Sequence, residues 1–564
     1  MVDATSSFVV SLIENRAKEV GIAAFDLRTA KLHLSQFIET SRSYQNTATL
    51  LQYFDPADII TPANLIESQG IIGLMTVVNQ CASASKVTLS RGCFDDTKGA
   101  ILVQSLVLNE TLNTTLEASY KEYYLCLGAA AALFRWIDHE KGITLANRSV
   151  EVTLNGSFDH MNIDGTSVRN LELVESLHIQ VGPQKKRGCL FEMLKTTKTV
   201  GGTRLLRASL LQPLKDKNTI NTRLDCLDEL TSDDQIFFGI SQALQKFPKD
   251  IDRILCSFCF KTKVTKDSSS KLTTRAGQSM VNSIILLKEA LDRLPSLQEA
   301  LQDAKCSLLS NIRDICSNES FRLLLQSNAL QLKVALTAIL MLHVKSFVQQ
   351  VKLSRERFAA SFYAFNIQSE LINRIREDLR LLTSLSESLA LLDMMVNSFV
   401  NLISTKPAES YIRPEFTETG PIAIEKGRHP VLEGTIAEEF VANNAFISEA
   451  SNTMIVTGPN MSGKSTYLRQ VVLITIMAHI GCYVPARFAS FRIVDHIFTR
   501  IGTSDNIELN SSTFMTEMRE TAYLLNNLTS RSLVVVDELG RATSTGDGFA
   551  IAWSCCEYML SFKA

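Results

Sequence analysis

The sequence predicts a multidomain protein of α + α/β class, in which an α/β domain, a long helical region and a second α/β domain follow one another. Three observations support this class. The chain has 564 residues, and since domains of ~150 residues are typical, several are expected. No glycine occurs between Gly277 and Gly420, which favours long helices. A glycine-rich loop begins at Gly458, between an apolar segment and a predicted helix, an order typical of α/β domains.

The composition is that of a globular protein, with 45% hydrophobic and 21% charged residues. This balance excludes a disordered, collagen-like or disulfide-stapled chain. The net charge of −2 excludes a positive electrostatic potential over the whole surface, so contacts to nucleic acid must come from local basic patches. The twelve cysteines are scattered, which indicates a reducing compartment. The longest apolar run of the helical middle, Val334–Leu342, is too short to span a bilayer, and we predict no membrane contact.

Residues 1–125 mix strand and helix signals and predict a small α/β domain. Gly21–Leu27 and Lys31–Ile38 have the β-branched and alternating pattern of strands joined by a short turn. Ile66–Asn79 and Thr111–Phe134 have helical periodicity.

Residues 126–406 predict a mostly helical domain, with a short strand at Val150–Leu154 as the exception. The segment Leu385–Val400 carries apolar residues at spacings of three and four, which we interpret as a core-facing helix stripe. These residues are Leu385, Leu389, Leu392, Met395, Val396 and Phe399.

Residues 407–564 predict the third domain, which begins in a stretch rich in proline and glycine. Within it, Thr453–Val456 is an expected strand, Lys464–Ile480 an expected helix, and Ser532–Val536 an expected buried parallel strand.

The glycine-rich loop fits the pattern G-x-x-x-x-G-K-[ST], in which backbone N–H groups wrap phosphate oxygens and the helix N-terminus adds positive charge. Lys464 is expected to reach the β- and γ-phosphates, and the Ser465 hydroxyl to bind Mg²⁺. A chance glycine loop is the alternative, which the flanking elements disfavour. The predicted nucleotide-binding residues are Gly458, Pro459, Asn460, Met461, Ser462, Gly463, Lys464, Ser465 and Thr466.

Two adjacent carboxylates, Asp537 and Glu538, follow the second buried strand. The carboxyl end of a strand is where open α/β sheets bind ligands, so Asp537 is expected to hold Mg²⁺. Glu538 is suited to orient and deprotonate an attacking water. A second carboxylate favours nucleotide hydrolysis over phosphoryl transfer to a small molecule, although a simple strand-ending turn is the alternative.

Three segments in this order resemble the MutS family of DNA-repair and recombination ATPases: Thr457–Tyr467, Ser512–Met518 and Asp537–Arg541. Three upstream segments also resemble the family: Asp164–Leu173, Leu194–Arg207 and Gly427–Glu433. The resemblance implies an RNase H-like connector at 1–125, a helical core and lever with a reduced clamp at 126–406, and an ABC-type P-loop ATPase at 407–564.

The resemblance also implies roles for single residues. The family works as a dimer with composite sites that bind ATP and Mg²⁺. Lys464, Glu538 and Ser512 would be catalytic, with Ser512 reaching the γ-phosphate of the partner. Asn460 would contact phosphate, and Phe440 would stack on adenine.

Within the family, Tyr411–Phe416 and Asn510–Met515 favour the meiotic branch, and the lack of a mismatch-wedge domain before the connector argues against mismatch recognition. This branch implies a heterodimer with the fifth MutS homologue, in the nucleus on meiotic chromosomes. The pair would enclose double-stranded DNA or Holliday junctions as an ATP-controlled clamp and promote crossovers in homologous recombination.

Several departures from the family leave alternatives open. Ala542 replaces a usual glycine, Asn506 a usual acid, and the chain stops at Ala564, so we expect a C-terminally incomplete ATPase domain. The two alternatives are a non-hydrolysing, truncated form that binds its partner, and a mismatch-repair homologue that lacks its N-terminal domain. The clamp would need exposed basic residues for DNA, and a solvated helix face is the alternative for them. These residues are Lys345, Lys352, Arg355, Arg357, Arg374 and Arg376.

Overall fold

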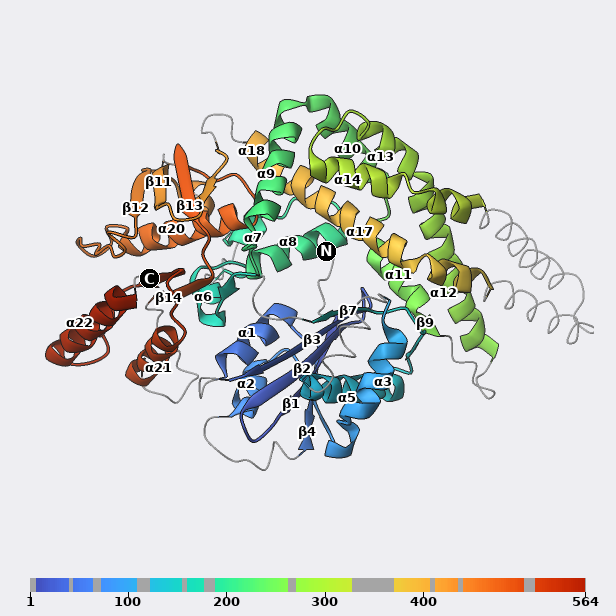
Figure 1. The fold of residues 1–564 in the computed structure, drawn as a ribbon, viewed down its shortest axis with the longest axis horizontal. Coiled ribbons are helices and arrows are strands. Elements are labelled where there is room, and N and C mark those ends of the chain that lie inside the picture. Colours follow the sequence, from blue (N-terminus) through green and yellow to red (C-terminus); the bar gives the residue numbers. More distant parts are fainter. Residues whose placement is uncertain are drawn as a thin grey trace, which may run out of the picture.

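The computed structural model shows an N-terminal sheet with its helices, an arch of helices above it, and a second sheet-bearing region beside the start of the arch (Figure 1). The mixed, multidomain class that we predicted is confirmed. The structure describes residues 7–39, 44–63, 73–108, 122–154, 160–176, 188–261, 270–326, 370–405, 411–434, 440–501 and 513–562.

The N-terminal sheet has six strands in the order β5-β4-β1-β2-β3-β7. The first three strands along the chain form an antiparallel meander, and the outer strands pair in parallel. The strands are β1 (Phe8–Glu14), β2 (Glu19–Asp26), β3 (Lys31–Ile38), β4 (Asp58–Pro62), β5 (Ser85–Leu89) and β7 (Glu151–Leu154).

Helices cover both faces of this sheet because alternate residues of its central strands are apolar on both sides. Val10, Leu12 and Ile22 face a core shared with α1 (Gln45–Phe54) and α2 (Leu74–Gln80). The opposite face packs on two further helices, α3 (Asp96–Leu106) and α5 (Tyr124–Glu140). A single turn of 3-10 helix, η2 (Arg91–Cys93), precedes α3.

The two predicted strands of the meander are confirmed as β2 and β3. The first parts of both predicted helices lie outside the described residues. Of Ile66–Asn79 the structure shows the second half as α2, and of Thr111–Phe134 it shows the part from Tyr124 onward as α5. Helix α5 spans residue 125 and strand β7 follows it, yet both pack on this sheet. The boundary at residue 125 stays a prediction.

The arch consists of helices from α6 to α18, with one short strand pair. All six apolar residues of the predicted stripe in Leu385–Val400 are buried. The elements are β6 (Thr144–Leu145), α6 (Gly165–Asn170), α7 (Leu190–Leu194), α8 (Val200–Leu211), α9 (Lys217–Ser232), α10 (Asp234–Lys246), α11 (Ile251–Cys259), β9 (Phe260–Lys261), α12 (Ser270–Asp292), α13 (Leu294–Ala300), α14 (Ser307–Cys316), α17 (Leu379–Asp393), the π-helical η3 (Met394–Val400) and α18 (Asn401–Ser404).

A fully buried carboxylate joins two helices of the arch. Asp393 accepts hydrogen bonds from the backbone N–H groups of Lys198 and Thr199, which directly precede α8, and from the Asn397 side chain. Charge-assisted bonds of this kind offset the cost of burying the carboxylate.

Of the basic residues considered for DNA contact, Lys345, Lys352, Arg355 and Arg357 lie outside the described residues. Arg374 pairs with Glu370 at 3.1 Å. The guanidinium of Arg376 donates to the carbonyls of Phe258 and Phe260, at 2.8 and 3.0 Å. Arg376 therefore contacts the backbone of α11 and β9, and its role in DNA contact stays a prediction.

The C-terminal region contains two sheets, in the orders β10-β13-β11-β12 and β15-β14-β8. The second sheet is wholly parallel, and its strand β8 comes from the start of the arch. The strands are β8 (Asn162–Ile163), β10 (Glu415–Thr417), β11 (Ile422–Gly427), β12 (Asn443–Ile447), β13 (Phe488–Arg492), β14 (His496–Arg500) and β15 (Ser532–Val536). The helices are α19 (Pro430–Glu433), α20 (Lys464–His479), α21 (Thr513–Asn526) and α22 (Thr545–Phe562).

The strand predicted at Thr453–Val456 is wrong. The segment forms no ladder with any described strand, and the side chains of Met454 and Ile455 are 44% and 80% exposed. An apolar segment becomes a strand only where a neighbour accepts and donates its backbone hydrogen bonds. Among the described strands, β15 pairs with β14 alone, and its other edge is not joined to this segment.

Within the described part of the chain, no helix is both long and apolar enough to cross a bilayer.

Candidate nucleotide site

The glycine-rich loop leads directly into α20. Gly463 caps this helix with a φ of +91°, a backbone conformation that glycine adopts without steric cost. The loop residues from Pro459 to Gly463 are exposed, whereas α20 is buried from Gln470 onward. The helix N-terminus therefore presents its free N–H groups at an open surface, an arrangement suited to binding an anion.

Lys464 lies at the first position of α20 and folds back over the loop. Its ammonium donates to the carbonyls of Gly458 and Pro459, at 2.7 and 2.8 Å. The positive charge is thereby held against the loop and not extended into solvent.

The loop and the second strand meet through two side chains. The Ser465 hydroxyl donates to Asp537 Oδ2 at 2.5 Å. Asp537 directly follows β15, and its N–H donates to the carbonyl of Arg500 at 2.7 Å. A hydroxyl and a carboxylate are oxygen ligands of the kind that Mg²⁺ prefers, usually with waters and phosphate oxygens in the remaining positions. The two side chains therefore fit a Mg²⁺ ion that a nucleotide shares.

Glu538 occupies a strained backbone position next to Asp537. Its φ is +52°, which is uncommon for a residue other than glycine. Its carboxylate is paired with Arg541 at 2.7 Å, and its side chain is 44% exposed. This pair is at the surface, where an ion pair is weak enough to exchange for another partner.

The turn after Glu538 is held by residues that the sequence interpretation missed. Glu517 of α21 accepts the N–H of Gly540 at 2.8 Å, and its carboxylate lies 3.7 Å from the guanidinium of Arg500. Glu517 belongs to a segment that resembles the family, but the N–H that it accepts belongs to Gly540, which lies 23 positions further on. Ala542, which replaces a usual glycine, does not have a positive φ, so no left-handed backbone is strained there.

The other predicted site residues are less closely tied to this centre. Asn460, Met461 and Ser462 lie on the exposed loop, and Thr466 is half-buried in the first turn of α20. Phe440 is half-buried and precedes β12. Ser512 and Asn506 lie outside the described residues.

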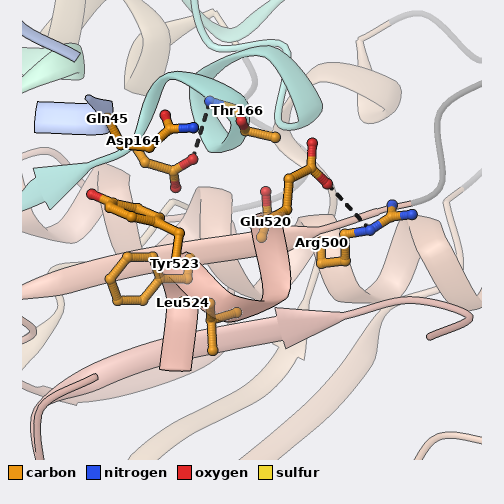
Figure 2. Close-up of a pocket in the computed structure, with 9 residues that line it drawn as sticks. Gln45, Asp164, Thr166, Arg500, Glu520, Tyr523 and Leu524 are labelled. Atoms are coloured by element: carbon orange, nitrogen blue, oxygen red, sulfur yellow. Dashed lines mark hydrogen bonds and ion pairs between the residues drawn. The ribbon is translucent and has the colours of Figure 1, made fainter. Parts of the chain in front are cut away.

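A small pocket lies behind this centre, where α1, α6, β14 and α21 meet (Figure 2). Its volume of about 10 Å³ leaves room for one water at most, so it is not a nucleotide site. It is lined by Gln45, Asp164, Thr166, Phe498, Thr499, Arg500, Glu520, Tyr523 and Leu524.

Two carboxylates in this pocket have raised pKa values. Burial raises the pKa of Asp164 to about 6, although hydrogen bonds from Ser167 and Thr166 lower it in part. Burial also raises the pKa of Glu520, which pairs with Arg500 at 3.2 Å. The pocket thus brings together ionisable groups from the start of the arch, Asp164, and from the C-terminal region, Arg500 and Glu520, beside Gln45 of α1.

Comparison with protein families matches three family models to this chain. MutS domain II matches residues 7–141, MutS domain III residues 166–398, and MutS domain V residues 454–564. The glycine-rich loop and both carboxylates after β15 fall within the third match.

Comparison with individual proteins gives the same family. The chain is 50% identical to the DNA mismatch repair protein MSH4 of Arabidopsis thaliana, over 99% of this chain and 82% of that protein. It is 32% identical to MutS protein homolog 4 of Mus musculus and 31% identical to that of Homo sapiens. Those two alignments cover 99% of this chain, and 66% and 68% of the relatives.

Proposed function

Because the chain belongs to the MutS family, we propose that it is an ATP-binding and ATP-hydrolysing subunit of a DNA clamp in meiotic homologous recombination. The observation that carries the ATPase proposal is the 2.5 Å contact between Ser465 and Asp537. This contact places Ser465, which directly follows the loop lysine Lys464, against Asp537 at the end of β15. A nucleotide with Mg²⁺ needs both groups at one point.

In this proposal the loop from Gly458 to Gly463 and the adjacent Thr466 wrap the phosphates, with Asn460 as a side-chain contact. Lys464 exchanges its two carbonyl partners for phosphate oxygens of ATP, which are stronger acceptors for a charged donor. Ser465 and Asp537 hold Mg²⁺, which neutralises charge on the phosphate oxygens when it is bound. Phe440 stacks on adenine.

Glu538 is the proposed general base. It orients a water against the terminal phosphate and accepts its proton, and for this it must leave Arg541. Ser512 completes the site of the partner subunit. Together these roles assign Lys464, Glu538 and Ser512 to catalysis.

The similarity to the plant MSH4 and to the two mammalian relatives named homolog 4 supports the meiotic branch. We propose a heterodimer with the fifth MutS homologue that binds Holliday junctions or related double-stranded DNA in the nucleus and promotes crossovers. The proposed division is a connector of RNase H-like fold at 1–125, a helical core and lever at 126–406, and an ABC-type ATPase domain at 407–564.

Mismatch repair is the second candidate, because the name of the plant relative includes it. The DNA structure that the protein binds more tightly distinguishes the recombination function from mismatch repair. The full chain, co-purified with its partner subunit, is titrated onto a four-way junction and onto a duplex with one mismatch, with ATP turnover measured in parallel. We expect tighter binding to the junction and turnover that Lys464→Ala abolishes. Preference for the mismatch supports the second candidate, and ATP binding without turnover supports a non-hydrolysing subunit.

A further inference from the structure

A buried glutamate lies directly beneath the turn that carries the two acids. The side chain of Glu517 is 1% exposed, and its Oε1 accepts the N–H of Gly540 at 2.8 Å. Gly540 has a φ of +82°, and a Cβ there would lie 2.6 Å from the carbonyl oxygen of Gly548 in α22. The turn is therefore wedged between α21 and α22 in a conformation that depends on glycine.

Arg500 connects this glutamate to the other end of the same turn. Its carbonyl accepts the N–H of Asp537 at 2.7 Å, and its guanidinium faces Glu517 at 3.7 Å. The same guanidinium pairs with Glu520, one helical turn further along α21 (Figure 2). The backbone is thus fixed at Asp537 and at Gly540, one residue before and two residues after Glu538.

This arrangement is a costly way to stabilise a fold. A carboxylate removed from water loses its hydration, and burying an ion pair often gives no net stability. The second oxygen of Glu517 makes no hydrogen bond within the described residues, so its burial is only partly compensated. An unsatisfied buried polar group in a native structure calls for an explanation, and a role in catalysis is one.

We propose that Glu517 is a positioning residue for hydrolysis: through the N–H of Gly540 it fixes the turn so that Asp537 faces Ser465 and Glu538 lies beside it. Arg500 supports this role by balancing the charge of Glu517 and by holding Asp537 with its own carbonyl. The inference rests on the proposed ATPase function. Glu517 would touch neither nucleotide nor metal. It would act through the backbone of the turn from Asp537 to Gly540, which we call the acid turn.

The test compares two substitutions at one position in the full chain. Glu517→Ala removes the acceptor for Gly540 N–H, whereas Glu517→Gln keeps a carbonyl oxygen there. We expect Glu517→Ala to lower kcat at least about tenfold, because small displacements of orienting groups have effects of this size. Glu517→Gln should restore most of the rate.

A binding readout separates positioning from loss of folded protein. Binding of a fluorescent, non-hydrolysable ATP analogue is measured without Mg²⁺ and then across a Mg²⁺ titration. Glu517→Ala should bind the analogue like the wild type without Mg²⁺, because the loop is intact. Its Mg²⁺ midpoint should rise at least about fivefold, since Asp537 is no longer held; a shift of this size follows from losing one orienting hydrogen bond.

Glu229→Ala is the matched control. Glu229 also accepts backbone N–H groups, those of Lys305 and Cys306, but it does so in the helical arch. It should leave kcat and the Mg²⁺ midpoint unchanged.

The outcomes separate the two proposals. If the wild type hydrolyses ATP and folded Glu517→Ala keeps the wild-type kcat and Mg²⁺ midpoint, the positioning role is refuted while the ATPase function stands. If Glu517→Ala does not fold, Glu517→Gln and Arg500→Gln decide, since Arg500→Gln removes the charge that balances Glu517. A wild-type kcat and Mg²⁺ midpoint for Arg500→Gln, or a Glu517→Gln variant as inactive as Lys464→Ala, contradicts the proposal. If the wild type itself neither binds nor hydrolyses ATP, the proposed function fails first.

Discussion

The hydroxyl of Ser465 and the carboxylate of Asp537 are joined by a hydrogen bond of 2.5 Å, although they lie 72 positions apart in the chain. One belongs to the first turn of α20 and the other to the end of β15. Polar groups that meet at the edge of a parallel sheet, next to a helix N-terminus, are typical of sites that bind a ligand through its phosphate groups.

Lys464→Ala should weaken binding of ATP with Mg²⁺ by about 10- to 100-fold, because a charge-assisted hydrogen bond contributes roughly 1.5–3 kcal/mol. Titration with a fluorescent ATP analogue measures the affinity, and phosphate release measures the rate, which should fall to background. Lys98→Ala is the control, since Lys98 is an exposed lysine paired with Asp95 far along the chain from the loop. Unchanged ATP affinity in Lys464→Ala would remove the basis for the loop assignment.

Gly540→Ala should destabilise the C-terminal region by about 1–3 kcal/mol, through a left-handed φ and a Cβ contact of 2.6 Å. It should also lower hydrolysis, since the acid turn must shift. Gly546→Ala is the matched control. Gly546 lies in the same helix as Gly548, and a Cβ at Gly546 meets nothing within 4 Å. Chemical denaturation followed by circular dichroism compares the two; equal stability of both variants would contradict the close packing of Gly540.

The stability of the fold around the small pocket of Figure 2 should depend on pH through Asp164. Its folded pKa of about 6 lies above the ordinary value of 3.8, so the folded state favours the protonated form. The stability contributed by this group is present below about pH 4 and is lost as pH rises through 6, by about 3 kcal/mol in total.

Asp164→Asn removes this titration, so the difference in unfolding free energy between wild type and variant should change between about pH 4.5 and about pH 7.5. Asp216→Asn is the control: Asp216 also caps a helix, but hydrogen bonds from Thr219 lower its pKa. Its contribution is present above the ordinary pKa and is lost only at more acid pH, so this variant should show no change in the same window. A flat difference for Asp164→Asn would show that the group is ionised throughout.

Binding to DNA should weaken as salt rises, because contacts between basic side chains and phosphates release counterions. With the partner subunit present, we expect a loss of about 10³-fold or more between about 50 and about 200 mM salt. Fluorescence anisotropy with a labelled junction measures this. An affinity independent of salt would count against a clamp that surrounds DNA.

The sequence alone was sufficient for the elements with strong local signals. The strands β2 and β3, the buried stripe of α17 and η3, and the glycine loop before α20 all follow from spacing and residue type. The strand at Thr453–Val456 failed because its apolar residues cannot show whether a neighbouring strand pairs with them. The roles of Glu517 and Asp393 were missed because the N–H groups that they bind lie 23 and about 195 positions away. The carbonyl partners of Arg376 were not predicted either, since a basic residue gives no sign of which acceptors its donors meet.

The most direct test of the central claim compares ATP turnover by the wild type and by Glu538→Gln, each co-purified with the partner subunit. Stopped-flow phosphate release gives the rate, and binding of radiolabelled ATP shows whether the site is filled. We predict steady hydrolysis by the wild type, and a Glu538→Gln protein that holds ATP with wild-type affinity but releases phosphate at least about 100-fold more slowly, as expected for loss of a general base. Phosphate release at the wild-type rate by Glu538→Gln would contradict the account.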